Sequence, residues 1–295
     1  TFNFGYDSNW QNYFNGNISD VAIWNLDLNP SEIAALYNSG TSISASNNSG
    51  DYVSSSNLKA YWNFNEGSGS VLIDQTSNDN DGTINGATWG PTVLNVPDSY
   101  STIQSALNAA TEGNIVLVQP GMYTENIFWP ETNGLKLISA GDSSNTIIDG
   151  GGVSSVIYMN PQSAMIDTNT LIKGFKITNG GNVNYGGGIF CYSASLKISA
   201  VQFDNNTANI RGGGVHLENS ESIFINSHFY ENIATEYGGG LSLKNDESLI
   251  LNCTFLQNSA GVGGGGVKLE TSSSLLKNLE ITNNSVTNDG LYRAG

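Results

Sequence analysis

The 295-residue sequence is poor in charged residues, and in basic ones above all. Only 12% of the residues are charged, and 10 Lys and Arg stand against 26 Asp and Glu, which leaves a formal net charge of -16. This excess of negative charge argues against nucleic acid as a partner and against docking on anionic membranes. No apolar run approaches the ~18 residues of a membrane-spanning helix, so we expect no membrane insertion by this segment.

The sequence also has only two histidines and two cysteines, and it does not begin with methionine. With two histidines, and no cluster that combines several acids with arginine, few residues are available for acid–base catalysis. No signal peptide is recognisable at Thr1, and the sequence stops inside a repeat. We therefore expect an interior segment of a longer chain.

Glycine triplets, in contrast, recur at a fixed spacing. They begin at Gly186, Gly212, Gly238 and Gly264, which is every 26 residues, and a fifth repeat begins at Gly290. Three consecutive glycines cost backbone entropy, so a chain that repeats them needs their conformation, as at a sharp corner. Fixed self-similarity at this length indicates a solenoid.

Each repeat holds three short runs with the alternation of β-strands and none with helical periodicity. Similar residues recur at the same offset, which indicates equivalent positions on successive coils ~4.8 Å apart. The four columns are Ile189, Val215, Leu241 and Val267; Cys191, Leu217, Leu243 and Leu269; Ile198, Phe224, Ile250 and Leu276; and Phe203, Phe229, Phe255 and Ile281. The pattern predicts an all-β fold, a parallel β-helix with regular coils over 186–289. We expect it to be right-handed because crossovers between parallel strands usually are.

Asparagine forms a further column, at Asn206, Asn232, Asn258 and Asn284, where stacked amides can hydrogen-bond from coil to coil. The pairing of GGG[IVL] with a following FxxN resembles the GGA[ILV] and FxxN repeats of the chlamydial polymorphic outer membrane proteins, which are surface adhesins. FDNN, FYEN and FLQN carry this resemblance, whereas ITNN at 281–284 departs in its first residue. Glycine in place of alanine in the triplet is a second departure.

A different pattern precedes the regular coils, and we place the start of the β-helix near residue 93. Helical spacing of Ile103, Ala106 and Leu107 predicts a helix over about 99–111, with Ser99 or Ser101 as its cap. A helix here would cover the open end of the solenoid. The stretch TIQSA, followed by PGMYTENI, resembles the first coil of pectinesterase-like and pectin-lyase-like β-helices, families that include carbohydrate-active enzymes.

The first ninety residues have no such repeats. Residues 13–40 resemble the C-terminal end of a laminin-G-like (concanavalin-type) jelly roll, with Asn29, Pro30 and Glu32 forming a capping box for a short helix. Residues 57–89 resemble the opening strands of the same family, so an end precedes a beginning. We expect a truncated jelly roll over 1–40, a Ser/Asn-rich linker over 41–56, a partial repeat over 57–92, and the β-helix over 93–295.

Asp74, Asn78, Asp79 and Asp81 crowd one loop of the partial repeat. Hard oxygen ligands at this density suit calcium, which jelly rolls of this family often bind. A turn rich in Asx residues explains the same pattern without a metal. Calcium is the only cofactor that the sequence suggests.

Two groups of side chains on the outer faces of the coils could support catalysis. In the first, His228 and Tyr230 share a face, with Asp204 and Lys176 in nearby columns, and Tyr and His can act as acid and base in polysaccharide elimination. The second is the column Glu218, Lys244 and Glu270, with His216 and Lys268 beside it. For the second group, a ladder of alternating charges that stabilises coil stacking is the simpler interpretation.

The cysteines lie two coils apart and on different strands. Cys191 and Cys253 are therefore separated by ~9.6 Å along the axis alone, beyond the reach of a disulfide. We expect both thiols to be free and to pack as small hydrophobic side chains.

Two functions follow from these patterns. The regular repeats and the scarcity of catalytic residues favour a non-enzymatic adhesin or stalk, extracellular or on a bacterial cell surface, that presents surfaces for a glycan or a surface protein. The resemblance to carbohydrate-active β-helices favours a polysaccharide lyase or hydrolase instead. We lean towards the first, with no catalytic residues.

Overall fold

The computed structural model describes residues 4, 6–7, 12–14, 16, 18–37, 43–67, 69–163 and 165–287. The chain divides into two compact units, Thr1–Pro91 and Thr92–Gly295, and we describe each by itself. Within the described ranges, no helix is both long enough and apolar enough to cross a bilayer.

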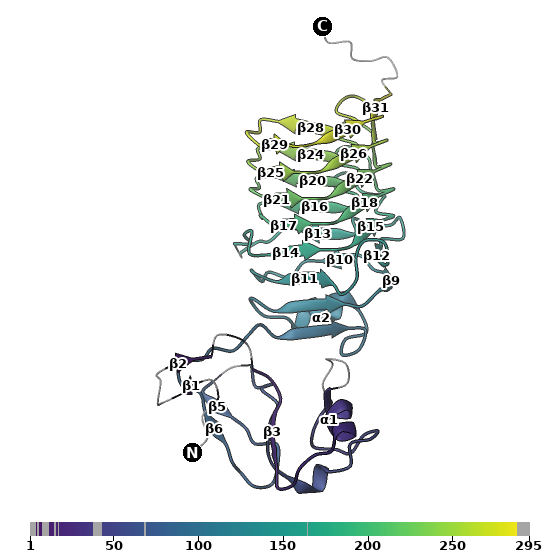
Figure 1. Ribbon diagram of the computed structural model, residues 1–295. Coiled ribbons are helices and arrows are strands. Elements are labelled where there is room, and N and C mark those ends of the chain that lie inside the picture. Colours follow the sequence, from purple (N-terminus) through teal and green to yellow (C-terminus); the bar gives the residue numbers. More distant parts are fainter. Residues whose placement is uncertain are drawn as a thin grey trace. The chain divides into compact units, whose positions relative to one another are not determined.

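The second unit is a parallel β-helix, in which successive coils stack and their strands pair into parallel sheets that run along the axis (Figure 1). The six-stranded sheet contains β10 (Ile127–Phe128), β13 (Ile157–Met159), β16 (Ile189–Tyr192), β20 (Val215–Glu218), β24 (Leu241–Lys244) and β28 (Val267–Glu270). The eight-stranded sheet contains β7 (Val93–Val96), β8 (Ile115–Val118), β11 (Lys136–Ser139), β14 (Leu171–Lys173), β17 (Lys197–Ser199), β21 (Ile223–Ile225), β25 (Leu249–Leu251) and β29 (Leu275–Lys277). The seven-stranded sheet contains β9 (Gly121–Thr124), β12 (Thr146–Asp149), β15 (Lys176–Thr178), β18 (Gln202–Asp204), β22 (His228–Tyr230), β26 (Thr254–Leu256) and β30 (Glu280–Thr282). A four-stranded sheet contains β19 (Thr207–Ala208), β23 (Ile233–Ala234), β27 (Ser259–Ala260) and β31 (Ser285–Val286).

The predicted columns are confirmed, and their residues are buried except in the last coil, where Leu269 and Ile281 are 41% and 51% exposed. Each strand of the regular coils pairs in register with the strand 26 residues later, so that Ile189 lies beside Val215 and Ile198 beside Phe224. Phe203, Phe229 and Phe255 are fully buried, and their ring centroids are 4.8 Å and 4.5 Å apart. The stack of rings and aliphatic side chains therefore forms one continuous core along the axis.

The asparagine column forms a hydrogen-bonded ladder inside the stack. The side-chain Nδ2 of Asn206, Asn232 and Asn258 each donates to Oδ1 of the asparagine one coil further on, at 3.0, 2.9 and 2.9 Å. Each of these Oδ1 atoms also accepts a backbone N–H from the asparagine of the preceding coil. Because the buried amides pair with each other, the polar column lies in the interior without unpaired groups.

The glycine triplets form the tight corner that their recurrence predicts. The first glycine of each triplet has a positive φ, 66° at Gly212, a conformation that residues with a Cβ rarely adopt. The second and third lie against the backbone of neighbouring coils, since a Cβ on Gly213 would be 2.4 Å from the Ile233 carbonyl oxygen. All three positions therefore require glycine, the first for its dihedral angle and the others for space.

Helix α2 (Ile103–Ala109), which follows β7 and precedes β8 in the chain, covers the N-terminal end of the core (Figure 1). Ile103 and Leu107 are fully buried in the same cluster as the first strands. The cap is neither Ser99 nor Ser101 but Thr102, whose hydroxyl oxygen accepts the backbone N–H of Ser105. Thr102 has the extended backbone that an N-cap needs, and its side chain lies one turn before this donor.

The first unit is small and contains short antiparallel pairs. Its strands are β1 (Tyr6–Asp7), β2 (Asn12–Tyr13), β3 (Val21–Trp24), β4 (Leu58–Trp62), β5 (Val71–Leu72) and β6 (Gly82–Thr83), with helix α1 (Pro30–Tyr37) and a 3-10 turn η2 (Ser55–Asn57). Strands β3 and β4 pair antiparallel with a bulge at Ile23 and Trp24. The predicted capping box is present, because Asn29 Oδ1 accepts the Glu32 N–H at 3.0 Å and Glu32 Oε2 accepts the Asn29 N–H at 3.1 Å.

The stretch 41–56, expected to be a linker, packs into this unit over its described part, 43–56. Ala45 and Tyr52 are buried, and the Tyr52 hydroxyl accepts the Trp24 Nε1–H at 2.9 Å and donates to the Ala45 carbonyl at 2.9 Å. The linker prediction rested on the Ser/Asn-rich composition of the stretch and gave no weight to Tyr52, its one large aromatic residue. The hydrogen bond from Trp24 to the Tyr52 hydroxyl attaches the segment to strand β3.

Candidate functional site

The first predicted catalytic group does not converge on one point. His228 and Tyr230 lie on the outer face of β22, but Lys176 pairs with Gln202, and Gln202 in turn with His228. The lysine is thus two coils from the histidine. Its Nζ instead lies 2.6 Å from Asp204 Oδ2, in an ion pair that holds it away from His228.

Tyr230 lies opposite Asp204 in the register of β18 and β22. A hydrogen bond with Glu231 raises the pKa of Tyr230, and burial and the charges of Glu231 and Asp204 raise it further. A tyrosine with a raised pKa holds its proton more tightly and is a poorer base near neutral pH. The structure therefore brings Asp204 to both Lys176 and Tyr230, in an arrangement suited to coil stacking.

The predicted calcium loop is organised around Asp74, which is buried. Its carboxylate accepts the backbone N–H groups of Tyr61, Thr76 and Asn80 at 2.9–3.0 Å, and also the Thr76 hydroxyl and the Asn80 amide. Burial raises the pKa of Asp74, but the hydrogen bonds outweigh it and the pKa lies below its usual value. Hydrogen bonds from the chain itself thus occupy both carboxylate oxygens of Asp74.

The other three residues of the loop serve the same turn. Asp81 Oδ1 accepts the Asp74 N–H at 2.9 Å, Asn78 Nδ2 donates to the Lys59 carbonyl at 3.0 Å, and Asp79 has a positive φ of 52°. In the part of the chain that the structure describes, no three His, Cys, Asp or Glu residues gather as metal ligands would. The Asx-rich turn accounts for these residues, and calcium binding stays a prediction.

The second predicted group does form a column. Glu218, Lys244 and Glu270 are aligned on β20, β24 and β28. Lys244 Nζ lies 2.8 Å from Glu218 Oε1, as a ladder of alternating charges requires, but Glu270 Oε2 is 2.6 Å from Arg211 Nη1 instead. Arg211 precedes the glycine corner and was not part of the prediction.

His216 is fully buried although it lies on the outward side of β20. Its ring stacks on Tyr185 at 5.2 Å and on Phe190 at 6.0 Å between centroids. Burial lowers the pKa of His216 to about 4; Glu218, at 3.7 Å, opposes this shift, and the charges of Arg211 and Lys244 add to it. The imidazole is therefore neutral at physiological pH.

Aromatic rings continue this surface towards the first coils. Phe128, Tyr158 and Phe190 share one register column of the six-stranded sheet, with ring centroids 5.9 and 5.1 Å apart, and Tyr185 lies 6.3 Å from Phe190. We call these four residues the aromatic platform. Phe128 is 60% exposed, Tyr158 36% and Tyr185 38%. The rings escaped prediction because Phe128 and Tyr158 lie in irregular coils, where the 26-residue period does not align them.

A polar pocket of about 260 Å³ follows the corner immediately after the six-stranded sheet. It is lined by Met165, Ile166, Ser193, Ala194, Ser195, Asn219, Ser220, Glu221, Asn245 and Glu247. Ser193, Asn219 and Asn245 each come one residue after an outward-facing residue of that sheet. Hydroxyl and amide groups thus border the charged end of the sheet, where they can bind hydroxyl-rich ligands.

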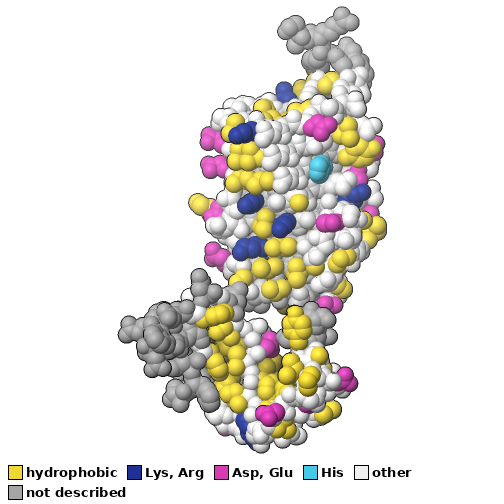
Figure 2. All heavy atoms as spheres, in the orientation of Figure 1, with side chains coloured by type: hydrophobic (Ala, Val, Ile, Leu, Met, Phe, Trp, Pro, Cys, Tyr) yellow, Lys and Arg dark blue, Asp and Glu magenta, His cyan; other side chains and the backbone are white. Residues whose placement is uncertain are grey.

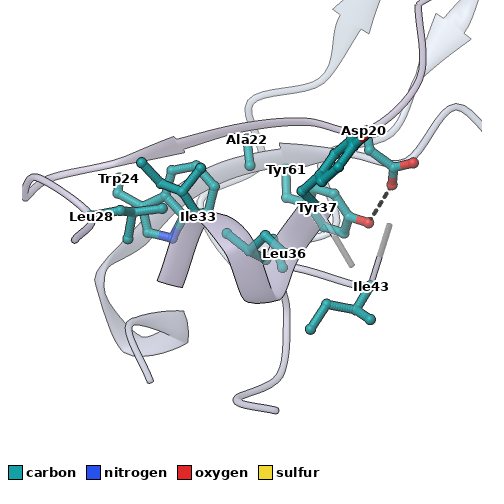
Figure 3. A pocket seen from close by; sticks show the side chains of 10 residues that line it. Asp20, Ala22, Trp24, Leu28, Ile33, Leu36, Tyr37, Ile43 and Tyr61 are labelled. Carbon is teal, nitrogen blue, oxygen red and sulfur yellow. Dashed lines mark hydrogen bonds between the residues drawn. The ribbon is translucent and has the colours of Figure 1, made fainter. Parts of the chain in front are cut away.

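A pocket of about 310 Å³ in the first unit has a different character (Figure 3). Trp24, Leu28, Ile33 and Leu36 line it, and they point into the space between α1 and the pair β3–β4. The hydrogen bond drawn in Figure 3 joins two polar groups of the lining: the Tyr61 hydroxyl donates to Asp20 Oδ1 at 2.7 Å. This apolar lining suits a hydrophobic group better than sugar hydroxyls.

The outer face of the eight-stranded sheet is aliphatic and basic. Figure 2 shows hydrophobic side chains and lysines side by side over these strands. The four lysines of the sheet are Lys136, Lys173, Lys197 and Lys277, and none of its strand residues, all of which the structure describes, is Asp or Glu. In a chain of net charge -16, this face stands apart from the rest.

Both cysteines are free, as predicted, and both are buried. Burial raises the pKa of the Cys191 thiol strongly and that of Cys253 to about 11. Protonated, buried thiols are poor nucleophiles, so these residues are structural.

Residues 126–293 match the family model described as the right-handed β-helix region. This span is 168 residues (293 - 126 + 1) of 295, so the chain belongs to that family. The predicted all-β, right-handed parallel β-helix is thereby confirmed. No curated protein sequence matches the chain significantly.

Among solved structures, the chain is similar to several pectin methylesterases. A mutant enzyme in complex with a hexasaccharide has 12% identity and a TM-score of 0.37, with 63% of this chain and 67% of that chain covered. PemA of Erwinia chrysanthemi has 9% identity and a TM-score of 0.33, with 68% and 92% covered. The Aspergillus niger enzyme has 13% identity and a TM-score of 0.34, with 71% and 92% covered. Similarity at this level says nothing about the activity of this chain.

Proposed function

We propose that this chain is a non-enzymatic segment of a bacterial adhesin or stalk, extracellular or on the cell surface, and that it binds neutral glycans. The observation that carries the proposal is the aromatic platform, in which partly exposed rings succeed one another from coil to coil at 5.1 and 5.9 Å. Tyr158 and Phe190 stack on each other with 23° between their planes, so the row offers its exposed ring edges and the uncovered parts of its faces to the C–H groups of successive sugars. The polar pocket beyond Glu218 offers hydroxyl and amide partners.

Charge supports a neutral rather than an acidic glycan. The net charge of -16 repels polyanionic polysaccharides, whereas uncharged sugars approach without this cost. The candidate catalytic residues also stand apart, since Lys176 is paired with Asp204 and lies two coils from His228. A binding role needs no such convergence.

For the first unit we propose a partial laminin-G-like jelly roll, made from the segments 1–40 and 57–92. The antiparallel pairing of β3 with β4 supports this, because it joins the segment that resembles the end of such a domain to the one that resembles its beginning. The β-helix over 93–295, with its adhesin-like repeats, would then extend or present these surfaces. A surface protein is the alternative partner.

The test is binding of neutral oligosaccharides, measured by calorimetry with cellohexaose, xylohexaose and maltohexaose. Tyr158→Ala should weaken binding about tenfold, because a stacked ring is worth about 1.4 kcal/mol in such a contact. Met122→Ala is the control, since Met122 is 66% exposed on β9, in another sheet. Unchanged affinity in Tyr158→Ala would remove the platform from the proposal.

The alternative function is that of a polysaccharide lyase or hydrolase. The aligned Glu218, Lys244 and Glu270 beside Arg211 favour it, because acids and cations are the groups that such chemistry uses. We expect no new unsaturated uronate absorbance when the chain is incubated with alginate, pectin or chondroitin. Turnover that is lost in Glu218→Gln, or in His228→Ala of the other candidate group, would favour the enzyme over the adhesin.

A further inference from the structure

Three parallel columns of outward side chains meet where the aromatic platform ends. The corner column contains Tyr185, Arg211 and Tyr237, which are joined by isolated parallel bridges. The middle column contains Phe190, His216, Ser242 and Lys268. The charged column contains Tyr192, Glu218, Lys244 and Glu270. Each column advances one coil per residue, so the three form a grid on the outer face of the six-stranded sheet.

One ion pair crosses this grid diagonally. Arg211 Nη1 lies 2.6 Å from Glu270 Oε2, although Glu270 is in the charged column and two coils further on. Ser242 lies between the two charged residues: it is in the middle column, on the coil between the coil of Arg211 and the coil of Glu270. The ion pair therefore passes over this small side chain. Arg211 also lies over the Tyr237 ring, 4.8 Å from its centroid, and Lys268 lies over the same ring at 5.2 Å.

The Arg211–Glu270 ion pair covers side chains that lack hydrogen-bond partners. His216 and Ser242 are neighbours in the middle column, and both are fully buried. Of the six buried side-chain atoms without a partner among the described residues, three are His216 Nδ1, His216 Nε2 and Ser242 Oγ. Glu218 Oε2 is 3.7 Å from His216 Nε2, beyond hydrogen-bond distance. Leaving buried polar atoms unpaired is costly, so a cluster of them is a candidate for completion by another molecule.

We propose that the Arg211–Glu270 ion pair covers a binding site for one sugar residue of a neutral glycan, and that His216 and Ser242 hydrogen-bond to its hydroxyl groups when the pair opens. A neutral imidazole donates from one nitrogen and accepts at the other, and a serine hydroxyl can do both, which matches two adjacent sugar hydroxyls. The site rests on the proposed function, because the platform delivers the chain of sugars to it: Phe190 is both the last ring of the platform and the neighbour of His216.

Opening the cover is feasible because the ion pair is partly in contact with water. The Arg211 and Glu270 side chains are 17% and 36% exposed. Ion pairs near the surface contribute little stability and are weakened by salt. Binding of a neutral sugar at this site should therefore strengthen with ionic strength, whereas stacking on the platform alone has no such dependence.

The experiment measures affinity for cellohexaose, xylohexaose and maltohexaose by calorimetry. Glu270→Gln and Arg211→Gln break the ion pair from opposite ends, and each should tighten binding about threefold to tenfold by removing the cost of opening. Glu280→Gln is the matched control, since it removes the same charge from an exposed position on β30, in another sheet. Adding Ser242→Ala to Glu270→Gln should return the affinity to the native value or below it.

A second measurement needs no substitution. Raising NaCl from about 0.05 to about 0.5 M should tighten binding to the native chain and leave that of Glu270→Gln unchanged. If Tyr158→Ala loses binding but Glu270→Gln and salt change nothing, the covered site is wrong and the platform stands. If neither the native chain nor Glu270→Gln binds any of the three sugars, both proposals fail.

Discussion

Single side chains hold the coils of this β-helix in register. Asn206, Asn232 and Asn258 each bond to the coil before and the coil after them, and the glycines of each triplet let the backbones of neighbouring coils approach closely. Neither role tolerates a substitute, because an amide must both donate and accept, and any Cβ at Gly213 would overlap a carbonyl oxygen.

Asn232→Ala should destabilise the β-helix by about 3 kcal/mol, because it leaves the Asn206 N–H buried without its partner and removes the side-chain bonds to Asn258 and to the Phe203 carbonyl. Urea unfolding measures the loss. The control is Asn108→Ala, at an exposed position of helix α2, where alanine favours the helix and stability should stay equal or rise. Equal effects at both positions would contradict the role of the ladder.

Gly213→Ala should cost about 3 kcal/mol or prevent folding, because the new methyl would lie 2.4 Å from the Ile233 carbonyl oxygen and 2.5 Å from that of Gly239. Gly263→Ala is the matched control, since its Cβ would meet only the Tyr237 ring at 3.7 Å, an ordinary contact. Thermal unfolding followed by circular dichroism compares the two. A Gly213→Ala protein as stable as native would show that the corner can shift.

The stability of the β-helix should fall as the pH drops from about 6.5 to about 4, because burial lowers the pKa of His216 to about 4 in the folded state. The unfolded chain binds this proton first, so up to about 3 kcal/mol is present above pH 6.5 and lost towards pH 4. Arg211, Lys244 and Glu218 face the ring and set this shift.

Urea unfolding as a function of pH tests this dependence. His216→Phe should flatten the curve between pH about 4 and 6.5, and it suits the site because Phe190 precedes it in the column. His228→Gln, on the exposed face, should keep the native curve because His216 is still present. A native curve without slope in this range would refute the expectation.

At the scale of elements, the sequence was sufficient wherever the period applied. Strands and columns of 186–287 follow from equal offsets, and α1 follows from Asn29 and Glu32 within one turn. Contacts that depend on side-chain reach were not predictable, such as Arg211 to Glu270 across two coils. The same holds for Tyr52, whose partners Trp24 and Ala45 lie outside any repeat.

Helix α2 depends on one carboxylate for its attachment. Glu125 accepts the N–H groups of Ile103 and Gln104 at 2.9 and 3.0 Å, at the positive end of the helix dipole. Glu125→Gln should destabilise the β-helix by about 1–2 kcal/mol through loss of this charge. Urea unfolding checks it, with Glu112→Gln, at an exposed position after the helix, as the control that should change little.

At the scale of the whole molecule, the coil is the unit of stability. Deleting residues 212–237, which is 26 residues, joins equivalent positions of adjacent coils and should leave a folded β-helix about 4.8 Å shorter. Deleting 212–236 instead shifts the alternation by one residue and turns core side chains outward, so this protein should not fold. Circular dichroism and resistance to proteolysis distinguish the two outcomes, and equal behaviour would contradict the register argument.

The constant period also has a genetic consequence. Because successive coils carry the same glycine corner and the same asparagine, a stretch of 26 codons can be copied or lost by recombination between repeats without disturbing the joints on either side. The length of the β-helix can thus change by whole coils in a single recombination event. Selection on the outward side chains, such as Tyr158 or Arg211, can then proceed separately from selection on the core.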